Sequence, residues 1–232
     1  MNPVVNAYFA RKRQRCRWAD YIARILLVGV GVAMALLLLR TLTGAATPTL
    51  VSALAHCDRR LFAAIDGERD RLDDIAQVKR RSGSLSYIAV GDRLRSDSSA
   101  VRFLAPYQDG PLVLDGYFDE VEDLGAGDAI FTWGFLVRGS VSDVSRALGL
   151  NTLQAWSLHR EGNAFVRTEV WDGSHWLFGA PDGGEDLPSD ARVERILFME
   201  ETEPTGVASV RIGCSLQGHV SAPMLLSARP DL

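Results

Sequence analysis

Apolar and polar residues follow three different patterns along this chain, and the first is one uninterrupted apolar run. The 15 residues from 25 to 39 carry no polar side chain. As a helix this run would be ~22 Å long, and extending it to residues 21–42 gives ~33 Å, close to the ~30 Å hydrocarbon core of a bilayer. Arg24 and Arg40 lie near its ends, where long side-chain stems carry the charge to the interface. The pattern predicts a transmembrane helix over 21–42, flanked by Arg24 and Arg40 and in contact with membrane lipid.

The basic residues around this run indicate its orientation. The positive-inside rule predicts that residues 1–20 are a basic cytoplasmic tail and that the chain beyond residue 42 is exported to the periplasm. A cleaved secretory signal is the alternative, with the small residues at 44–46 as the cleavage site. The long N-terminal segment and the position of Arg40 favour a retained single-span anchor in a bacterial inner membrane. The segment before residue 21 contains Arg11, Lys12, Arg13, Arg15 and Arg17. Between the apolar run and Arg59 the only lysine or arginine is Arg40.

The second pattern has helical spacing and predicts a membrane-proximal helix over 47–81. Thr47 and Pro48 are a favourable helix start, and apolar residues then recur three, four or seven apart between charged faces. A continuous helix would be ~50 Å long, weakened at Gly67. It would be a stalk that pairs with itself or another envelope protein through 48–81, with Leu61 and Ile65 in the seam, or its apolar stripe would pack on the following domain. The stripe consists of Leu50, Leu54, Leu61, Ile65, Leu72 and Ile75.

The third pattern, over 84–232, consists of short apolar or alternating runs separated by turn residues. Alternation is clearest near the end of the chain, where Val210, Ile212, Cys214 and Leu216 share one face. One helix is predicted after the capping box that begins at Ser140. The pattern predicts an antiparallel β-rich periplasmic domain, and with the preceding helix an α+β fold. The predicted strands are 85–90, 101–107, 111–118, 129–137, 153–160, 165–171, 175–178, 193–200 and 207–216, with 220–228 as an edge strand.

Three cysteines add a prediction about covalent structure. Cys16 is cytoplasmic in the predicted topology, so Cys57 and Cys214 are the only exported pair. Cys57 lies on the apolar stripe of the predicted helix, and Cys214 lies on the apolar face of its strand. Because exported cysteines meet an oxidising compartment, the pair is predicted to form a disulfide if the start of the helix packs on the sheet. Two unrelated thiols are the alternative.

Charge and motifs exclude several classes of function. The chain has a net charge of −4, and most of its N-terminal basic cluster precedes the apolar run, so the exported part is acidic and nucleic acid is not an expected partner. A phosphate-binding loop and a hydrolase nucleophile elbow are both missing from the sequence. The four histidines lack metal-ligand spacing. No cofactor, metal ligand or catalytic residue is predicted. Acidic clusters are interpreted as solvated loops, namely Asp115, Asp119, Glu120, Glu122 and Asp123, and Asp182, Glu185 and Asp186.

The residues from Trp171 to Trp176 are the most individual segment of the predicted domain. Two tryptophans bracket a tight turn that also contains His175, with Trp156 on the neighbouring strand. Trp171, His175 and Trp176 could form an exposed edge that recognises a partner. The alternative is that the rings fill the core of the sheet.

The predicted layout is similar in architecture to inner-membrane assembly proteins of bacterial pilus, secretion and conjugation machines. This is a likeness of layout and not of motif. It suggests a non-enzymatic single-span scaffold or assembly subunit of an envelope complex. A membrane-tethered inhibitor or immunity-type binding protein is the second hypothesis, because it needs no stalk. A periplasmic hydrolase with a carboxylate pair is the third, because the separation of two carboxylates is not visible in a sequence.

Overall fold

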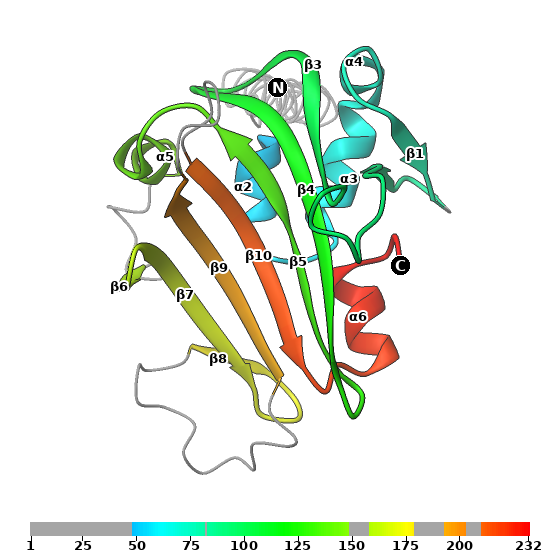
Figure 1. The fold of residues 1–232 in the computed structure, drawn as a ribbon, viewed down its shortest axis with the longest axis vertical. Helices are drawn as coiled ribbons and strands as arrows, with labels where there is room; N and C mark the ends of the chain where they lie inside the picture. Colours follow the sequence, from blue (N-terminus) through cyan, green and yellow to red (C-terminus); the bar gives the residue numbers. More distant parts are fainter. Residues whose placement is uncertain (1–47, 82, 149–157, 179–192, 203–209) are drawn as a thin grey trace, which may run out of the picture. The chain divides into compact units, whose positions relative to one another are not determined.

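Eight antiparallel strands form the main sheet, in the order β3-β4-β5-β10-β9-β7-β6 with β8 also paired to β7 (Figure 1). The structure is a computed structural model that describes residues 48–81, 83–148, 158–178, 193–202 and 210–232. The predicted β-rich antiparallel domain is confirmed. The strands are β3 (Ala100–Asp109), β4 (Leu112–Gly125), β5 (Asp128–Val137), β6 (His159–Glu161), β7 (Ala164–Trp171), β8 (Trp176–Phe178), β9 (Val193–Glu201) and β10 (Val210–Gly218).

The register of the central strands places the alternating residues as the pattern predicts. Cys214 of β10 lies opposite Trp133 of β5 and Leu197 of β9. Alternate residues of a strand point to the same face of the sheet, so this register places the apolar side chains of β5, β10 and β9 on one shared face. Its fully buried members include Trp133, Phe135, Leu197, Met199, Val210, Ile212, Cys214 and Leu216.

Glycines allow aromatic rings to lie flat on the opposite face of the sheet. Gly213 of β10 is paired with Gly134 of β5. Phe118 from β4 and Phe198 from β9 pack over this pair, with ring centroids 6.3 Å apart. A Cβ atom on Gly213 would lie 2.7 Å from each ring, so no other residue fits without displacing them. Aromatic cover of this kind compensates for the weak strand propensity of glycine.

Three short helices take the place of the predicted helix over 47–81, so the prediction of one continuous helix is wrong. They are α2 (Leu50–Leu54), α3 (Arg60–Gly67) and α4 (Arg69–Asp73). The chain leaves helical geometry at Cys57, whose φ of 50° is far from the right-handed helical region. The strand β1 (Val78–Arg80) then pairs with β2 (Ser86–Ile88) in a second, two-stranded sheet.

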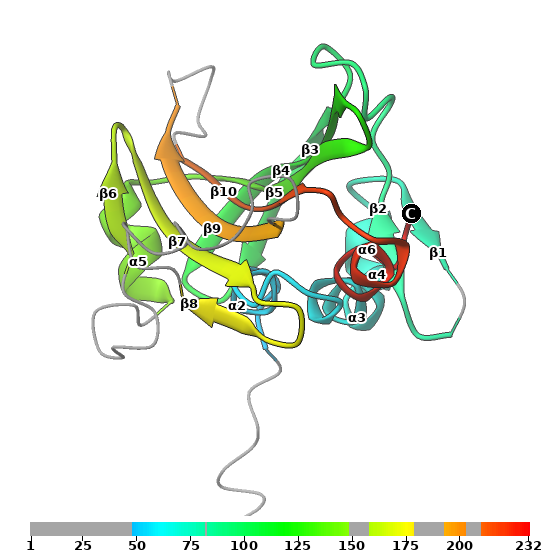
Figure 2. The ribbon, with the colours of Figure 1, turned by 90° about the horizontal axis from the view of Figure 1, so that it is seen from below.

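The apolar stripe is part of the domain core. Leu50, Leu54, Leu61, Ile65 and Leu72 are at most 1% exposed and join the cluster that contains the apolar face of the sheet. Figure 2 shows α2 and α3 on one side of the curved sheet. Leu61 and Ile65 are therefore not available to a partner, and the stalk interpretation of 48–81 is wrong. The alternative, that the stripe packs on the domain, is what the structure shows.

Asp109 fixes the start of α2 to the end of β3. Its two carboxylate oxygens accept hydrogen bonds from the backbone N–H groups of Leu50 (2.8 Å) and Val51 (2.9 Å). The Thr49 hydroxyl accepts a third from Ser52 N–H. Burial raises the pKa of Asp109, while the two backbone donors oppose that shift. These bonds supply partners for the first helical N–H groups, which have none within the helix.

The predicted edge strand over 220–228 is also wrong, because these residues form the helix α6 (Ala222–Ala228). Pro223 lies in its first turn, where a missing N–H costs nothing and the fixed φ suits a helix. The predicted helix after Ser140 is present as α5 (Val141–Ala147). Its capping box is complete, with Ser140 and Asp143 each accepting from the other's backbone.

Among the described residues, no helix is long and apolar enough to cross a membrane. The predicted tail over 1–20 and the predicted span over 21–42, with Arg24 and Arg40, lie outside the described residues.

Cys57 and Cys214 form a disulfide, as predicted. The sulfur atoms are 1.99 Å apart and the Cα atoms 5.4 Å apart. Both residues are fully buried. The bond joins the turn between α2 and α3 to the middle of β10, so it ties the N-terminal helices to the centre of the sheet.

Replacing both cysteines by alanine should lower the free energy of unfolding by about 2–5 kcal/mol. The disulfide spans 157 residues of sequence, and chain-entropy models give about 5 kcal/mol for a loop of that length. Urea denaturation of the full chain measures the change. The matched control is Cys16→Ala, which removes a cysteine outside this bond and should have no effect. Equal stability of the double variant and the wild type would contradict the prediction.

Candidate functional site

Four charged side chains form a buried box where α6 meets the sheet. Asp119 comes from β4, Arg93 from the loop between β2 and β3, and Arg229 and Asp231 from the segment after α6. Arg229 donates to Asp119 at 2.8 Å and to Asp231 at 2.9 Å. Arg93 donates to the same two carboxylates at 2.7 Å and 2.6 Å. Two guanidinium groups and two carboxylates thus alternate around a closed network without net charge.

Pairing is what permits Arg229 to be buried. Its side chain is 0% exposed, and an unpaired charge at such a site would cost several kcal/mol. Burial by itself lowers the pKa of Arg229, but Asp119 and Asp231 outweigh it and raise the pKa above its usual value. The guanidinium also lies 4.9 Å from the ring centroid of Trp133. The box therefore fixes the chain after α6 against β4 and β5.

The box leaves three buried donors without a hydrogen-bond partner among the described residues. They are Nη1 of Arg229, the hydroxyl of Tyr117 and the indole nitrogen of Trp133. Burial raises the pKa of Tyr117, and the negative charge of Asp119 adds to the shift. A neutral Tyr117 therefore persists beside the box at all physiological pH values.

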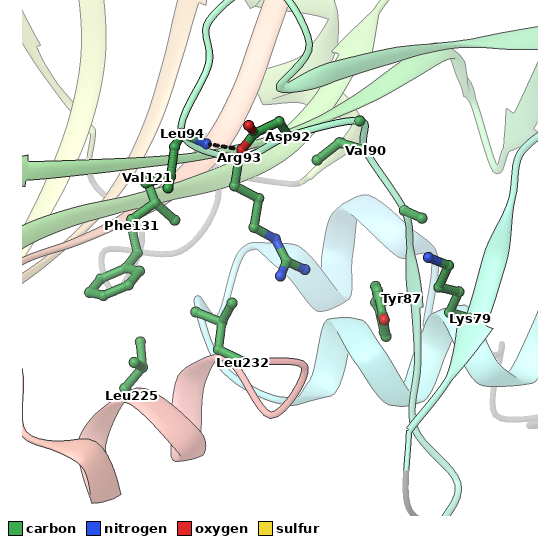
Figure 3. Close-up of a pocket in the computed structure, with 12 residues that line it drawn as sticks. Lys79, Tyr87, Val90, Asp92, Arg93, Leu94, Val121, Phe131, Leu225 and Leu232 are labelled. Carbon is green, nitrogen blue, oxygen red and sulfur yellow. Dashed lines mark hydrogen bonds between the residues drawn. The ribbon is translucent and has the colours of Figure 1, made fainter.

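A pocket of about 510 Å³ opens beside the box, between α6, the small sheet and one end of the main sheet (Figure 3). Val121 of β4 and Phe131 of β5 are cross-strand partners in its wall, and they lie on the same sheet face as Asp119 and Trp133. Both are only half-buried, so the apolar face of the sheet is open at this end. The lining consists of Lys79, Tyr87, Ala89, Val90, Gly91, Asp92, Arg93, Leu94, Val121, Phe131, Leu225 and Leu232.

Arg93 connects the pocket to the box. Its side chain is 25% exposed, whereas the carboxylates it contacts are 1% exposed. The guanidinium carbon lies 5.7 Å from the ring centroid of Tyr87, which also lines the pocket. A ligand in the pocket would therefore contact the exposed side of an otherwise buried ion network.

The predicted acidic cluster of β4 does not form a solvated loop, because these residues lie within the strand. Asp119 belongs to the box, Asp115 pairs with Arg138 at 2.7 Å, and Glu120 pairs with Arg211 at 2.9 Å. Glu122 and Asp123 are exposed. The second predicted cluster, Asp182, Glu185 and Asp186, lies outside the described residues.

Buried carboxylates in the described part of the chain all have structural partners. Asp109 accepts backbone N–H groups at the start of α2, and Asp119 and Asp231 pair with two arginines. Glu169 of β7 pairs with Arg195 and Arg167. The pocket lining contains one side-chain carboxylate, that of Asp92, which accepts a hydrogen bond from Leu94 N–H at 2.9 Å. No group of three or more metal-ligating side chains is placed to hold an ion within this part of the chain.

The predicted recognition segment forms the hairpin between β7 and β8. Trp171 and Trp176 are directly opposite each other, with ring centroids 5.4 Å apart, and both rings are half-buried against the core. The guanidinium of Arg195 lies 4.4 Å from the Trp176 ring centroid. His175 is exposed in the turn, so the structure gathers all three predicted residues at one hairpin.

Leu177 and Phe178, which the sequence did not single out, are 53% and 64% exposed in β8. The exposed apolar residues of this hairpin therefore follow the predicted segment, which ended at Trp176, by one and two residues. Trp156, predicted beside this hairpin, is outside the described residues.

Sequence reasoning missed the box and the pocket. Arg93 and Asp231 are 138 residues apart in the chain, and Asp119 and Arg229 are 110 apart. No motif or periodicity connects such residues, because their contact depends on α6 returning to the sheet. No protein-family model, curated protein or solved structure matches this chain.

Replacing Arg229 by alanine should destabilise the domain by about 3–5 kcal/mol, because it leaves two buried carboxylates facing a single arginine. The matched control is Arg95→Ala. Its ion pair with Asp97 has the same 2.7 Å separation as the Arg93–Asp119 pair of the box, but its two side chains are 66% and 65% exposed. That control should leave the free energy of unfolding unchanged. Urea denaturation at pH 7 measures both changes, and equal effects of the two substitutions would contradict a stabilising role for the box.

Proposed function

We propose that this chain is a single-span membrane protein of the bacterial envelope that acts by binding, as a non-enzymatic scaffold or assembly subunit. Its exported domain, and not a helical stalk, would provide the contacts. The apolar run at 25–39 and the basic residues before it support the anchor and its orientation.

The disulfide is the observation that carries the proposal. Cys57 and Cys214 are joined and fully buried, and structural disulfides persist in oxidising compartments such as the periplasm. Both cysteines follow the predicted span, whereas Cys16 precedes it. The distribution of the three cysteines therefore supports a cytoplasmic N-terminus and an exported domain.

The length of the connecting segment restricts how such a subunit would work. Between a span ending at residue 42 and the first turn of α2 lie only residues 43–49. Seven extended residues reach at most ~25 Å, so the domain would be held close to the bilayer surface. A partner would then be another protein at or near that surface.

The surface that best fits a partner is the β7–β8 hairpin, with exposed His175, Leu177 and Phe178 beside Trp176. An apolar edge strand of this kind is suited to binding another chain. A membrane-tethered inhibitor or immunity-type protein remains the second candidate. The burial of the stripe favours it as well, because such a protein acts through its domain alone.

The two lysines of the chain provide a test of this proposal. Lys12 lies in the predicted cytoplasmic tail, and Lys79 is exposed on β1. A membrane-impermeant amine reagent applied to spheroplasts should modify Lys79 and spare Lys12, as peptide mass spectrometry would show. Permeabilised cells are the control, in which both should be modified. Modification of Lys12 in intact spheroplasts, or protection of Lys79 until permeabilisation, would refute the topology.

A photocrosslinking residue at His175 in the same cells separates the two binding hypotheses. An assembly subunit should crosslink in growing cells to a constant envelope protein. A tethered inhibitor should crosslink only when its target is present. The same residue placed at Leu104, which is 87% exposed on β3, is the control position. Equal crosslinking from both positions would remove the hairpin as the contact surface.

A further inference from the structure

We propose that the pocket between α6 and the two sheets binds a small monocarboxylate with a compact apolar body. This inference concerns the folded domain and holds whether or not the chain is anchored in a membrane. It rests on the size of the pocket, on the separation of apolar and charged groups within it, and on the charges that the protein leaves unpaired there.

The pocket has the volume of a small-molecule site. Its ~510 Å³ lies within the range of about 300–1,000 Å³ that is usual for sites of small ligands. Such sites combine a mostly apolar wall with a few polar groups that orient the ligand. The wall here consists of side chains from β1, β2, β4, β5, α6 and the loop after β2, so its shape is set by several packed elements.

The lining is divided into an apolar and a charged half (Figure 3). Leu94, Val121, Phe131 and Leu225 lie together on one side of Arg93. Lys79 and Tyr87 lie on the other side, together with Val90. A ligand that fits both halves must carry an apolar body at one end and a polar group at the other.

The unpaired charge in the polar half is positive. The guanidinium of Arg93 is committed to Asp119 and Asp231, and Arg229 balances the remaining charge of that box. The ammonium group of Lys79 has no ion pair or hydrogen bond with any described residue, and the residue is exposed at the pocket. The hydroxyl of Tyr87 beside it can donate a second hydrogen bond.

A carboxylate is the group that this half of the pocket recognises best. One ammonium group offers a single positive charge and up to three donors, which matches one monoanion. Asp92, the one side-chain carboxylate of the lining, lies in the loop next to Arg93 and accepts a hydrogen bond from Leu94 N–H.

The test uses 4-phenylbutyrate as the probe and the full chain in nanodiscs of zwitterionic lipid. Titration calorimetry should show saturable binding to the wild type. The neutral isostere 4-phenylbutyramide should bind about fivefold more weakly, because it lacks the charge that Lys79 recognises. Lys79→Gln should weaken phenylbutyrate binding by a similar factor and leave amide binding unchanged.

The apolar half is tested by a matched pair of exposed leucines. Leu94 is 70% exposed at the rim of the pocket, and Leu104 is 87% exposed outside it. Leu94→Asp should abolish phenylbutyrate binding, whereas Leu104→Asp should leave it at the wild-type level. Both variants change an exposed leucine, so both should keep the thermal stability of the wild type.

Three outcomes would overturn the proposal. They are the absence of saturable binding, equal affinity for the acid and the amide, and unchanged binding in Leu94→Asp. If Leu94→Asp does not fold, the comparison of acid and amide on the wild type and on Lys79→Gln still decides. Failure of the topology experiment with Lys12 and Lys79 leaves this result unaffected, because no membrane is needed for the pocket to form.

Discussion

The packing of α2 and α3 against the apolar face of the main sheet is the contact on which the rest of the structure depends. Leu54, Leu61 and Ile65 are fully buried by it. Two links hold the helices in place, the Cys57–Cys214 disulfide at one end of α2 and the Asp109 carboxylate at the other. A covalent bond and a helix cap thus fix α2, whose five residues are too few to form a stable helix alone.

These helices cover only part of the sheet face, and this determines where a site can exist. Nearer the other end of β4 and β5 the cover comes from α6, which is tied down by Arg229 and Asp231. Beside α6, Val121 and Phe131 are half-buried, and the pocket opens there between α6 and the small sheet. The buried box therefore has two structural consequences: it attaches the end of the chain, and it presents one face of Arg93 to the pocket.

The sequence was informative where the determining contacts are local or where few pairings are possible. Alternation at 210–216 predicted the strand and its buried face, and the pair of cysteines that follows the predicted span predicted the disulfide. The helix over 47–81 was predicted as continuous because the apolar spacing persists across the turn, and no proline or glycine marks Cys57, where the chain turns. The tail at 220–228 was mistaken for a strand because its apolar content outweighed Pro223 as a helix start. The box was not predictable, since it joins Arg93 and Asp119 to Arg229 and Asp231, which lie more than a hundred residues further along the chain.

Native-state hydrogen exchange tests the central claim, that the N-terminal helices and the sheet are one cooperative unit. The amides to compare are Ile65 in α3 and Cys214 in β10, which lies between β5 and β9. If the helices belong to the core, both should exchange only through global unfolding, with equal free energies that fall together when urea is added. Exchange of Ile65 at a much lower free energy, independent of urea while Cys214 remains protected, would show a helix that opens without the sheet and would contradict the account.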